Sequence, residues 1–187
     1  MRLFYACWIP PDWAGENLLP FINRCKDADP QLKWVNPEMW HLTLAFLGET
    51  DPGRLPLLLS IGEQAAQTTV PVRLSPGRFG CFGKPHARVF WLGFKAETPD
   101  LSKMAWNIGN LLSKYKFPVD EKEFVPHLTL ARAGRGKSVS PGLLSLARES
   151  RIGGAFYLTE LALVKSVLKR GGPSYENAGN FPFCGGN

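Results

Sequence analysis

The pentapeptide His41-Leu42-Thr43-Leu44-Ala45 occurs a second time, unchanged, as His127-Leu128-Thr129-Leu130-Ala131. Alternate residues of a β-strand point to opposite faces of a sheet. If both copies are strands, each places its His and Thr on one face and its two Leu on the other. A lone strand histidine is usually structural, but these copies contain two of only three histidines in the chain. The repeat therefore predicts two strands that each present an imidazole and a hydroxyl to a cleft.

The composition is typical of a globular protein, with 187 residues, of which 44% are hydrophobic and 20% charged. We expect a single domain over residues 1–187. No apolar run approaches the ~20 residues that span a bilayer, and the first residues do not resemble a secretion signal. The four cysteines, Cys7, Cys25, Cys81 and Cys184, form no CxxC pair. We expect reduced thiols in a cytoplasmic monomer without a membrane partner, and the net charge of +6 suits a polyanionic partner.

Hydrophobic periodicity and turn residues predict an α+β order of elements. The expected strands cover residues 3–9, 32–35, 41–48, 70–74, 88–94, 127–133, 158–167 and 174–177, and the tail 181–187 is a candidate for another. The expected helices cover residues 12–26, 51–67, 98–115 and 140–148, and residues 76–85 are expected to form a Gly/Pro-rich loop. Pro20 should kink or shorten the first helix, while Thr98-Pro99 should begin the third, whose apolar stripe runs to Tyr115.

The two copies of the pentapeptide lie almost half a chain apart, and each follows a predicted helix. This order suggests a bilobal α+β protein in which two pseudo-symmetric lobes face each other across a cleft.

Two imidazoles suit acid–base chemistry because a histidine titrates near neutral pH, with an unperturbed pKa of ~6.5. One histidine can then accept a proton from an attacking water while the other donates a proton to a departing alkoxide. The threonine hydroxyls can hold phosphate oxygens between them. A strained five-membered cyclic phosphate needs no metal for this reaction. Metal binding is the competing interpretation, but neither copy has a carboxylate at i+2, and Glu49 and Glu123 stand outside both copies.

The sequence resembles the 2H phosphoesterase superfamily, and within it the RNA 2',3'-cyclic phosphodiesterases, also called 2'-5' RNA ligases. The resemblance covers almost the whole chain, and it implies that each lobe contains an antiparallel sheet with flanking helices and that the active-site cleft lies between the two sheets. It rests on Leu3-Phe4, Pro37-Glu38-x-x-His41-Leu-Thr-Leu-Ala-Phe-Leu-Gly48, Trp91-Leu92-Gly93, Phe124-x-Pro126-His127-Leu-Thr-Leu-Ala-Arg132, Leu163-x-x-Ser166 and Gly172-x-x-Tyr175. The resemblance implies metal-independent hydrolysis of RNA 2',3'-cyclic phosphate ends, or of a nucleoside cyclic phosphate, to 2'-phosphates, without a cofactor. It also implies reversible 2'-5' ligation in some members.

Carried over by position, the resemblance makes His41 and His127 the catalytic pair and Thr43 and Thr129 the phosphate donors. His41 would be the acid and His127 the base. Arg132 would be a further phosphate ligand.

Arg132 and Phe46 each follow a motif histidine by five residues, so a regular strand would turn them away from the cleft. Arg132 could reach a phosphate only if its strand bends or ends there, and otherwise it is a solvated surface residue. Phe46 could stack a base at the cleft rim, although core packing is the favoured interpretation. His86 is expected at the surface. The tryptophans Trp8, Trp34, Trp40 and Trp91 are expected in the core or on strands.

Three functions are compatible with these residues. The favoured one is the cyclic phosphodiesterase. The second is a 2'-5' RNA ligase, or a phosphodiesterase for another cyclic phosphate or a 2'-5' oligonucleotide, that uses the same residues. The third is a non-catalytic RNA-binding module, to which the basic loops 135–137 and 165–170 could contribute. Two intact pairs of titrating and hydroxyl groups argue against the third.

Overall fold

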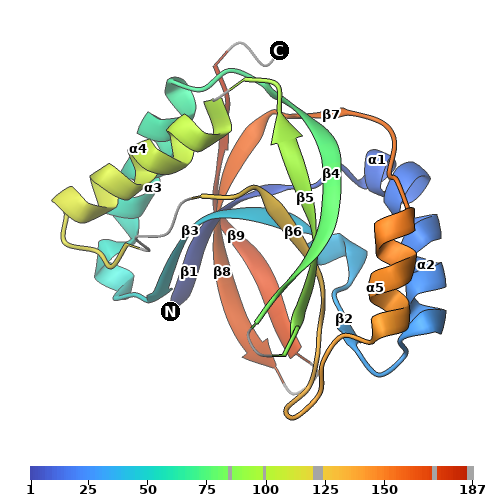
Figure 1. The fold of residues 1–187 in the computed structure, drawn as a ribbon. Helices are drawn as coiled ribbons and strands as arrows, with labels where there is room; N and C mark the ends of the chain where they lie inside the picture. The colour runs from blue at the N-terminus through green and yellow to red at the C-terminus, as the bar shows by residue number, and fades with distance from the viewer. Residues whose placement is uncertain (84–85, 99, 120–123, 170–171, 185–187) are drawn as a thin grey trace.

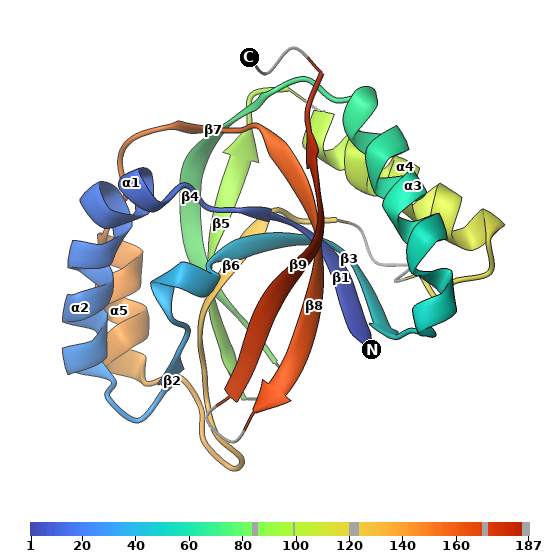
Figure 2. The ribbon, with the colours of Figure 1, turned by 180° about the vertical axis from the view of Figure 1, so that it is seen from behind.

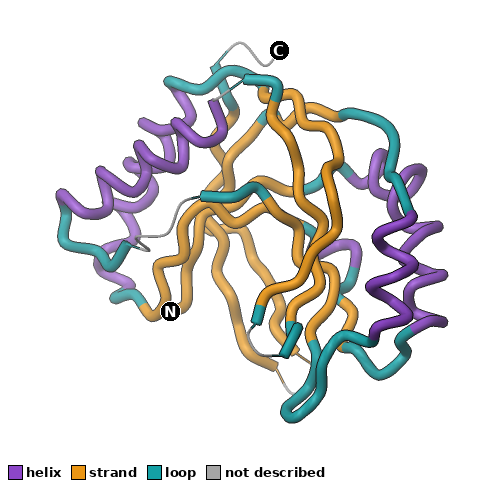
Figure 3. Tube along the Cα trace, in the orientation of Figure 1, coloured by secondary structure: helices purple, strands orange, loops and turns teal. Residues whose placement is uncertain are grey.

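The computed structural model describes residues 1–83, 86–98, 100–119, 124–169 and 172–184 (Figure 1). These residues form a curled nine-stranded antiparallel sheet with helices packed on two sides of it (Figures 1 and 3). The strands are β1 (Arg2–Trp8), β2 (Lys33–Trp34), β3 (His41–Glu49), β4 (Val72–Phe82), β5 (Val89–Ala96), β6 (His127–Arg132), β7 (Phe156–Leu158), β8 (Glu160–Lys169) and β9 (Gly172–Pro182). The α-helices are α1 (Pro11–Trp13), α2 (Leu19–Ala28), α3 (Leu55–Gln67), α4 (Asp100–Lys114) and α5 (Pro141–Glu149). Among the described residues, no helix is long and apolar enough to cross a bilayer.

The sheet has two lobes that meet at its centre. Its strand order is β7-β4-β5-β6-β3-β1-β8-β9, and β2 pairs with β6 beside this path. The two central strands, β6 and β3, share one paired position, Leu42 opposite Leu128. We call this position the central rung, the strands β3, β1, β8 and β9 the first lobe, and the strands β6, β5, β4 and β7 the second lobe. The expected bilobal α+β fold is confirmed, with the two expected sheets continuous through this rung.

Each lobe combines strands from early and late parts of the chain. In the first lobe, β1 pairs with β3 on one side and with the late strand β8 on the other. In the second lobe, the early strand β4 pairs with both β5 and β7. The helices follow the same rule, because early α3 packs with late α4 and early α2 packs with late α5 (Figures 1 and 2). The two sequence halves are therefore exchanged between the lobes.

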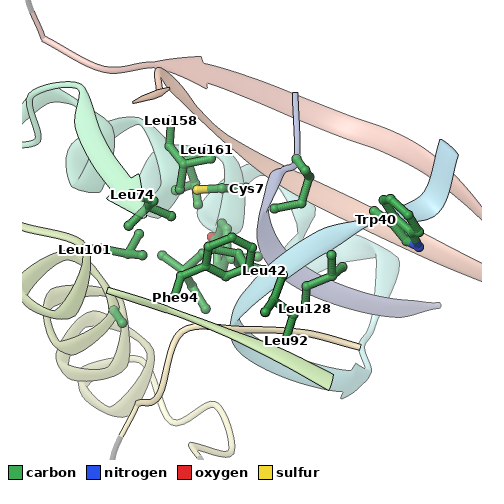
Figure 4. Close-up of a cluster of buried hydrophobic side chains, with 14 of the residues drawn as sticks. Cys7, Trp40, Leu42, Leu74, Leu92, Phe94, Leu101, Leu128, Leu158 and Leu161 are labelled. Atoms are coloured by element: carbon green, nitrogen blue, oxygen red, sulfur yellow. The ribbon is translucent and has the colours of Figure 1, made fainter. Parts of the chain in front are cut away.

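The main core lies between the sheet and its helices, and leucines from both pentapeptides enter it. Leu42 and Leu128 are almost completely buried next to Leu92 and Phe94 (Figure 4). Strand β1 is buried on both faces, which explains its unbroken apolar run. Leu3, Tyr5 and Cys7 join the main core, whereas Phe4 and Ala6 join a smaller apolar cluster with Ala162 and Val164 of β8.

The first helical segment is interrupted where its proline predicts. α1 is followed by a π-helical turn, Ala14–Leu18, and α2 begins one residue before Pro20. Proline lacks the N–H that a regular helix would use, and its ring clashes with the carbonyl four residues earlier. The expected distortion at Pro20 is thus confirmed, and it takes the form of the wider π turn.

The expectation of a loop over residues 76–85 is wrong for most of that stretch. β4 continues through it to Phe82, with an irregular register between Pro76 and Phe79. This irregularity lets the strand pass its proline and glycine, which a regular central strand would not accommodate. Residues 84–85 lie outside the described residues. β9 likewise extends to Pro182, so part of the tail belongs to this strand, while residues 185–187 are not described.

The third and fourth predicted helices are present, with one correction. In α4 the buried stripe contains Leu101, Met104, Ala105, Ile108 and Leu112. Tyr115 is not part of it, because α4 ends at Lys114 and the tyrosine beyond that end is exposed. Pro99 lies outside the described residues. Ser140 begins α5 as expected, since its Oγ accepts a hydrogen bond from the Leu143 N–H at 3.2 Å.

Candidate active site

A cavity of about 450 Å³ opens between the two lobes. All six residues that the sequence singled out line it, namely His41, Thr43, Phe46, His127, Thr129 and Arg132. The first three belong to β3 and the other three to β6, the two strands that meet at the centre of the sheet. The structure therefore brings the two pentapeptides together at one site.

The central rung fixes how the four motif side chains are arranged. His41 and Thr43 flank Leu42, and His127 and Thr129 flank Leu128, its partner on the antiparallel strand. Because neighbouring residues of a strand point to opposite faces, the leucines enter the core while the histidines and threonines face the cavity. The antiparallel direction sets His41 on the side of Thr129 and Thr43 on the side of His127. The two imidazoles therefore occupy diagonal corners of the site.

Both imidazoles are held by the same backbone contact. The Nδ1 atom of His41 lies 2.7 Å from the Met39 carbonyl oxygen, and Nδ1 of His127 lies 2.8 Å from the Val125 carbonyl oxygen. A carbonyl oxygen can only accept a hydrogen bond, so each Nδ1 carries the hydrogen. Nε2 is then the titrating nitrogen of each ring, an acceptor when the ring is neutral and a donor when it is protonated. The geometry suits one histidine to accept a proton and the other to donate one.

His41 is enclosed by aromatic rings of the first lobe. The ring centroids of Phe4, Tyr175 and Trp8 lie 5.1, 5.4 and 5.6 Å from its own. This burial lowers the pKa of His41 from 6.5, and the positive charges of Arg132 and His127 lower it further, while the hydrogen bond to the Met39 carbonyl partly offsets these effects. The neutral form of His41 is therefore favoured in the free protein.

His127 has a different aromatic surrounding from the second lobe. Phe82 meets it edge-on, with ring centroids 5.0 Å apart, and Trp91 lies at 6.1 Å. Trp91 lies against Gly80, where even a Cβ atom would come closer to the indole than real Cβ atoms do. The glycine thus leaves room for the tryptophan that supports His127.

An irregularity in each motif strand explains how Phe46 and Arg132 reach the cavity. In β3, Thr43 pairs with Ala6 and Ala45 with Tyr5, so Leu44 is an extra residue in the ladder. In β6, Leu130 is the extra residue between Thr129 and Ala131 in the pairing with β5. One extra residue is a β-bulge and reverses the facing of the residues after it. The regular alternation expected for these strands is therefore wrong beyond the bulges.

The bulges give Phe46 and Arg132 equivalent positions on opposite sides of the cavity. Core packing is the wrong interpretation for Phe46, whose side chain is 51% exposed. The guanidinium of Arg2 lies over its ring, 5.6 Å from the ring centroid. Burial lowers the pKa of His41 and raises the pKa of Tyr175, and the positive charge of Arg132 adds to the first shift and opposes the second. The guanidinium therefore lies where an anion between the histidines would meet it.

Several cavity residues were not predicted from the sequence. Phe4 and Tyr175 belong to the stretches that carry the family resemblance, but the sequence predicts no site role for them or for Lys33. The four tryptophans lie in the core or on strands, as expected: Trp40 is buried, and Trp8, Trp34 and Trp91 belong to β1, β2 and β5. Their places at the site were not predicted, because Trp34 lines the cavity and Trp8 and Trp91 flank the histidines. His86 is exposed, as expected. Within the described part of the chain, no three His, Cys, Asp or Glu side chains are grouped as metal ligands would be.

A curled antiparallel sheet with two His-x-Thr strands facing one cavity agrees with the class that the sequence resembles, the 2H phosphoesterases. The model of the family described as LigT like Phosphoesterase matches the chain twice, over residues 9–91 and 93–175. The chain therefore belongs to the LigT-like phosphoesterase family.

Curated relatives are similar over most of the chain. The RNA 2',3'-cyclic phosphodiesterase of Archaeoglobus fulgidus is 32% identical over 95% of this chain and 97% of its own length. A protein of the same name from Geobacillus stearothermophilus is 31% identical over 92% of this chain, which spans only 54% of that relative. Among solved structures, TT0787 of Thermus thermophilus matches with 28% identity and a TM-score of 0.81, and the match covers 100% of each chain. E. coli LigT complexed with 3'-AMP shares the fold, with a TM-score of 0.76 at 23% identity over 97% of each chain.

Proposed function

We propose that the protein hydrolyses 2',3'-cyclic phosphate ends of RNA to 2'-phosphates by two-histidine acid–base catalysis. The observation that carries the proposal is the diagonal pair of imidazoles, each with Nδ1 bound to a carbonyl and Nε2 left to transfer a proton. A pure binding module would not need two titrating groups arranged in this way. The names of the relatives, RNA 2',3'-cyclic phosphodiesterase, support the choice of substrate.

In the proposed reaction, the cyclic phosphate lies between the two His-x-Thr pairs. The neutral histidine accepts a proton from water as the water oxygen bonds to phosphorus. The bond from phosphorus to O3' breaks, and the protonated histidine donates its proton to O3'. The products are a 2'-phosphomonoester and a free 3'-hydroxyl. No redox change or external co-reactant other than water is required.

Thr43, Thr129 and Arg132 are proposed to bind the non-bridging phosphate oxygens during this reaction. Negative charge on these oxygens grows as water attacks, so hydroxyl donors and a guanidinium stabilise the transition state more than the ground state. Arg132 offers two donors to one phosphate, a geometry that a lysine does not reproduce. The phosphate charge also favours the protonated form of the histidine that it touches.

The test is to incubate the protein with a short RNA ending in a 2',3'-cyclic phosphate and to identify the products by chromatography against 2'- and 3'-phosphate standards. We expect the 2'-phosphate, and we expect its formation to require both His41 and His127. Exclusive formation of a 3'-phosphate would overturn the assigned bond cleavage. Turnover of 2'-5'-linked RNA without turnover of the cyclic phosphate would favour the alternative substrate class.

A further inference from the structure

The two walls of the cavity differ in chemistry. The first-lobe wall is mostly apolar and contains Phe4, Phe46, Pro173 and Tyr175. The wall formed by the second-lobe strand β6 and its partner β2, called the second-lobe wall, carries two cations, Arg132 on β6 and Lys33 on β2. A nucleoside presents apolar faces on its base and negative charge only on its phosphates. The apolar wall thus suits the nucleoside, and the cationic wall suits phosphate.

Lys33 and Arg132 are neighbours across the β2–β6 pairing. They are register partners in this antiparallel pair, so their side chains leave the same face of the sheet. Opposite residues in such a pair have Cβ atoms about 4.5–5.5 Å apart. β2 pairs with β6 beside the main strand path, so Lys33 lies one strand farther from His127 and Thr129 than Arg132 does. The two cations form a row leading away from the motif residues.

The charges on this wall exceed what one cyclic phosphate requires. A single cyclic phosphate carries one negative charge, and Arg132 already lines the cavity together with the two histidines to meet it. Within the described part of the chain, neither Lys33 nor Arg132 has a carboxylate within 4.0 Å, so neither charge is offset by an ion pair there. Lys33 is an exposed, flexible point charge, of the kind that binds a phosphate without strict geometry.

We propose that Lys33 binds the phosphate on the 5' side of the terminal nucleotide. This inference rests on the proposed function and adds a substrate class to it. The favoured substrate carries a second phosphate, as in an RNA chain or a 5'-phosphorylated nucleotide, and an unphosphorylated nucleoside 2',3'-cyclic phosphate is a poorer one. Lys33 is thus a specificity residue, whereas Arg132 acts at the reacting phosphate.

The kinetic test compares adenosine 2',3'-cyclic phosphate with the same compound carrying a 5'-phosphate. The wild-type protein should have the lower KM for the 5'-phosphorylated substrate. In Lys33→Gln this advantage should fall by about 3- to 10-fold, an effect on KM and not on kcat, and Lys33→Arg should retain most of it. The salt dependence of kcat/KM for the phosphorylated substrate should also become shallower by roughly one charge. Lys103→Gln on α4, which removes an exposed lysine away from the cavity, is the matched control.

An equilibrium arm separates this inference from the proposed reaction. Adenosine 2',5'-bisphosphate and adenosine 2'-phosphate are titrated into the protein, and their dissociation constants are compared by calorimetry. The bisphosphate should bind more tightly, and Lys33→Gln should reduce the difference between the two ligands. If Lys33→Gln weakens both ligands equally, or neither, the subsite is refuted even when the enzyme is active. If the bisphosphate preference depends on Lys33 but no cyclic phosphate is hydrolysed, the proposed reaction is refuted and the phosphate subsite remains.

Discussion

His41 and His127 come from identical pentapeptides but lie in different surroundings. Three aromatic rings enclose His41, whereas His127 lies next to Phe82, which is 42% exposed. Each pentapeptide supplies the imidazole, and the residue two positions before it supplies the carbonyl partner. The packing of the first lobe around His41 lowers the pKa of that imidazole.

Replacing either histidine should remove most of the activity. We expect His41→Ala and His127→Ala each to lower kcat by ~10²–10⁴, because each removes one proton-transfer step. The double variant should lose far less than the product of the two losses, since the residues act as a unit. Single-turnover hydrolysis of a 2',3'-cyclic phosphate measures these rates. His86→Ala is the control and should retain full activity, and near-full activity in either motif variant would refute the assignment.

The pH dependence should reveal which histidine acts as the acid. The pKa of His41 is lowered in the free protein, so the limb of the kcat/KM profile that depends on it should have its midpoint below pH 6.5. If His41 is the base, this is the acid limb, because protonation on lowering the pH removes the acceptor. If His41 is the acid, as the resemblance implies, it is the alkaline limb, because raising the pH removes the proton.

Measuring the same profile in His41→Ala identifies the limb that disappears. A substrate with a good leaving group should restore activity to the variant lacking the acid more than to the variant lacking the base. Because the two imidazoles interact, each apparent pKa also reflects the charge of the other ring, so the profile of the variant is needed to assign a limb to one residue. A flat wild-type profile from about pH 5 to 9, with chemistry rate-limiting, would contradict acid–base catalysis by two histidines.

Among the elements, the bulged strands β3 and β6 bring the most chemistry to the site. In a regular strand, only the His and Thr would face the cavity, and the residue five positions after the His would point into the core. The extra residues Leu44 and Leu130 instead return Phe46 and Arg132 to the cavity. Each strand thus presents three side chains to the cavity while its leucines remain in the core.

The packing of Trp91 against His127 can be tested by a substitution at Gly80, which lies against the indole. Gly80→Ala would force a methyl group into Trp91, and overpacking of this kind costs about 1–3 kcal/mol of unfolding free energy. Displacement of the indole should also lower kcat, because Trp91 packs against His127. Urea denaturation and turnover of a cyclic phosphate measure the two effects. Gly142→Ala in α5, with open space around its Cβ, should keep or raise stability and leave turnover unchanged, so an equally mild Gly80→Ala would contradict this account.

The sequence predicts the site better than it predicts the strand details. The alternation of His, Leu, Thr and Leu correctly indicates which side chains face the cavity, because a two-residue period applies between His41 and Thr43. The bulges have no local sequence signal, since an Ala after HLTL is compatible with a regular strand. The length of β4 was also missed, because glycine and proline normally indicate a loop, and only pairing with β5 keeps that segment extended.

At the scale of the whole molecule, the two lobes together supply the proton-transfer and phosphate-binding groups that the proposed hydrolysis needs. The two imidazoles transfer protons, and Arg132 and the threonines can bind the phosphate, while ring strain in the substrate favours opening. We therefore expect hydrolysis to continue in excess EDTA at an unchanged rate, measured after extensive dialysis against the chelator. A loss of activity that a divalent cation restores would show that a metal takes part. An unrelated metal-dependent phosphodiesterase assayed alongside confirms that the chelator is effective.

The exchange of strands between the lobes also affects how the protein is made. β1 leaves the ribosome long before one of its two partners, β8, which begins only at Glu160. Until then, Phe4 and Ala6 lack the valine and alanine of β8 that cover them in the finished protein. A chain that stops after the first sequence repeat therefore exposes an apolar strand with an unpaired edge, which favours aggregation. Because the first lobe needs β8 and the second lobe needs β7, neither lobe, and so neither side of the cleft, can be completed before these late strands are synthesised.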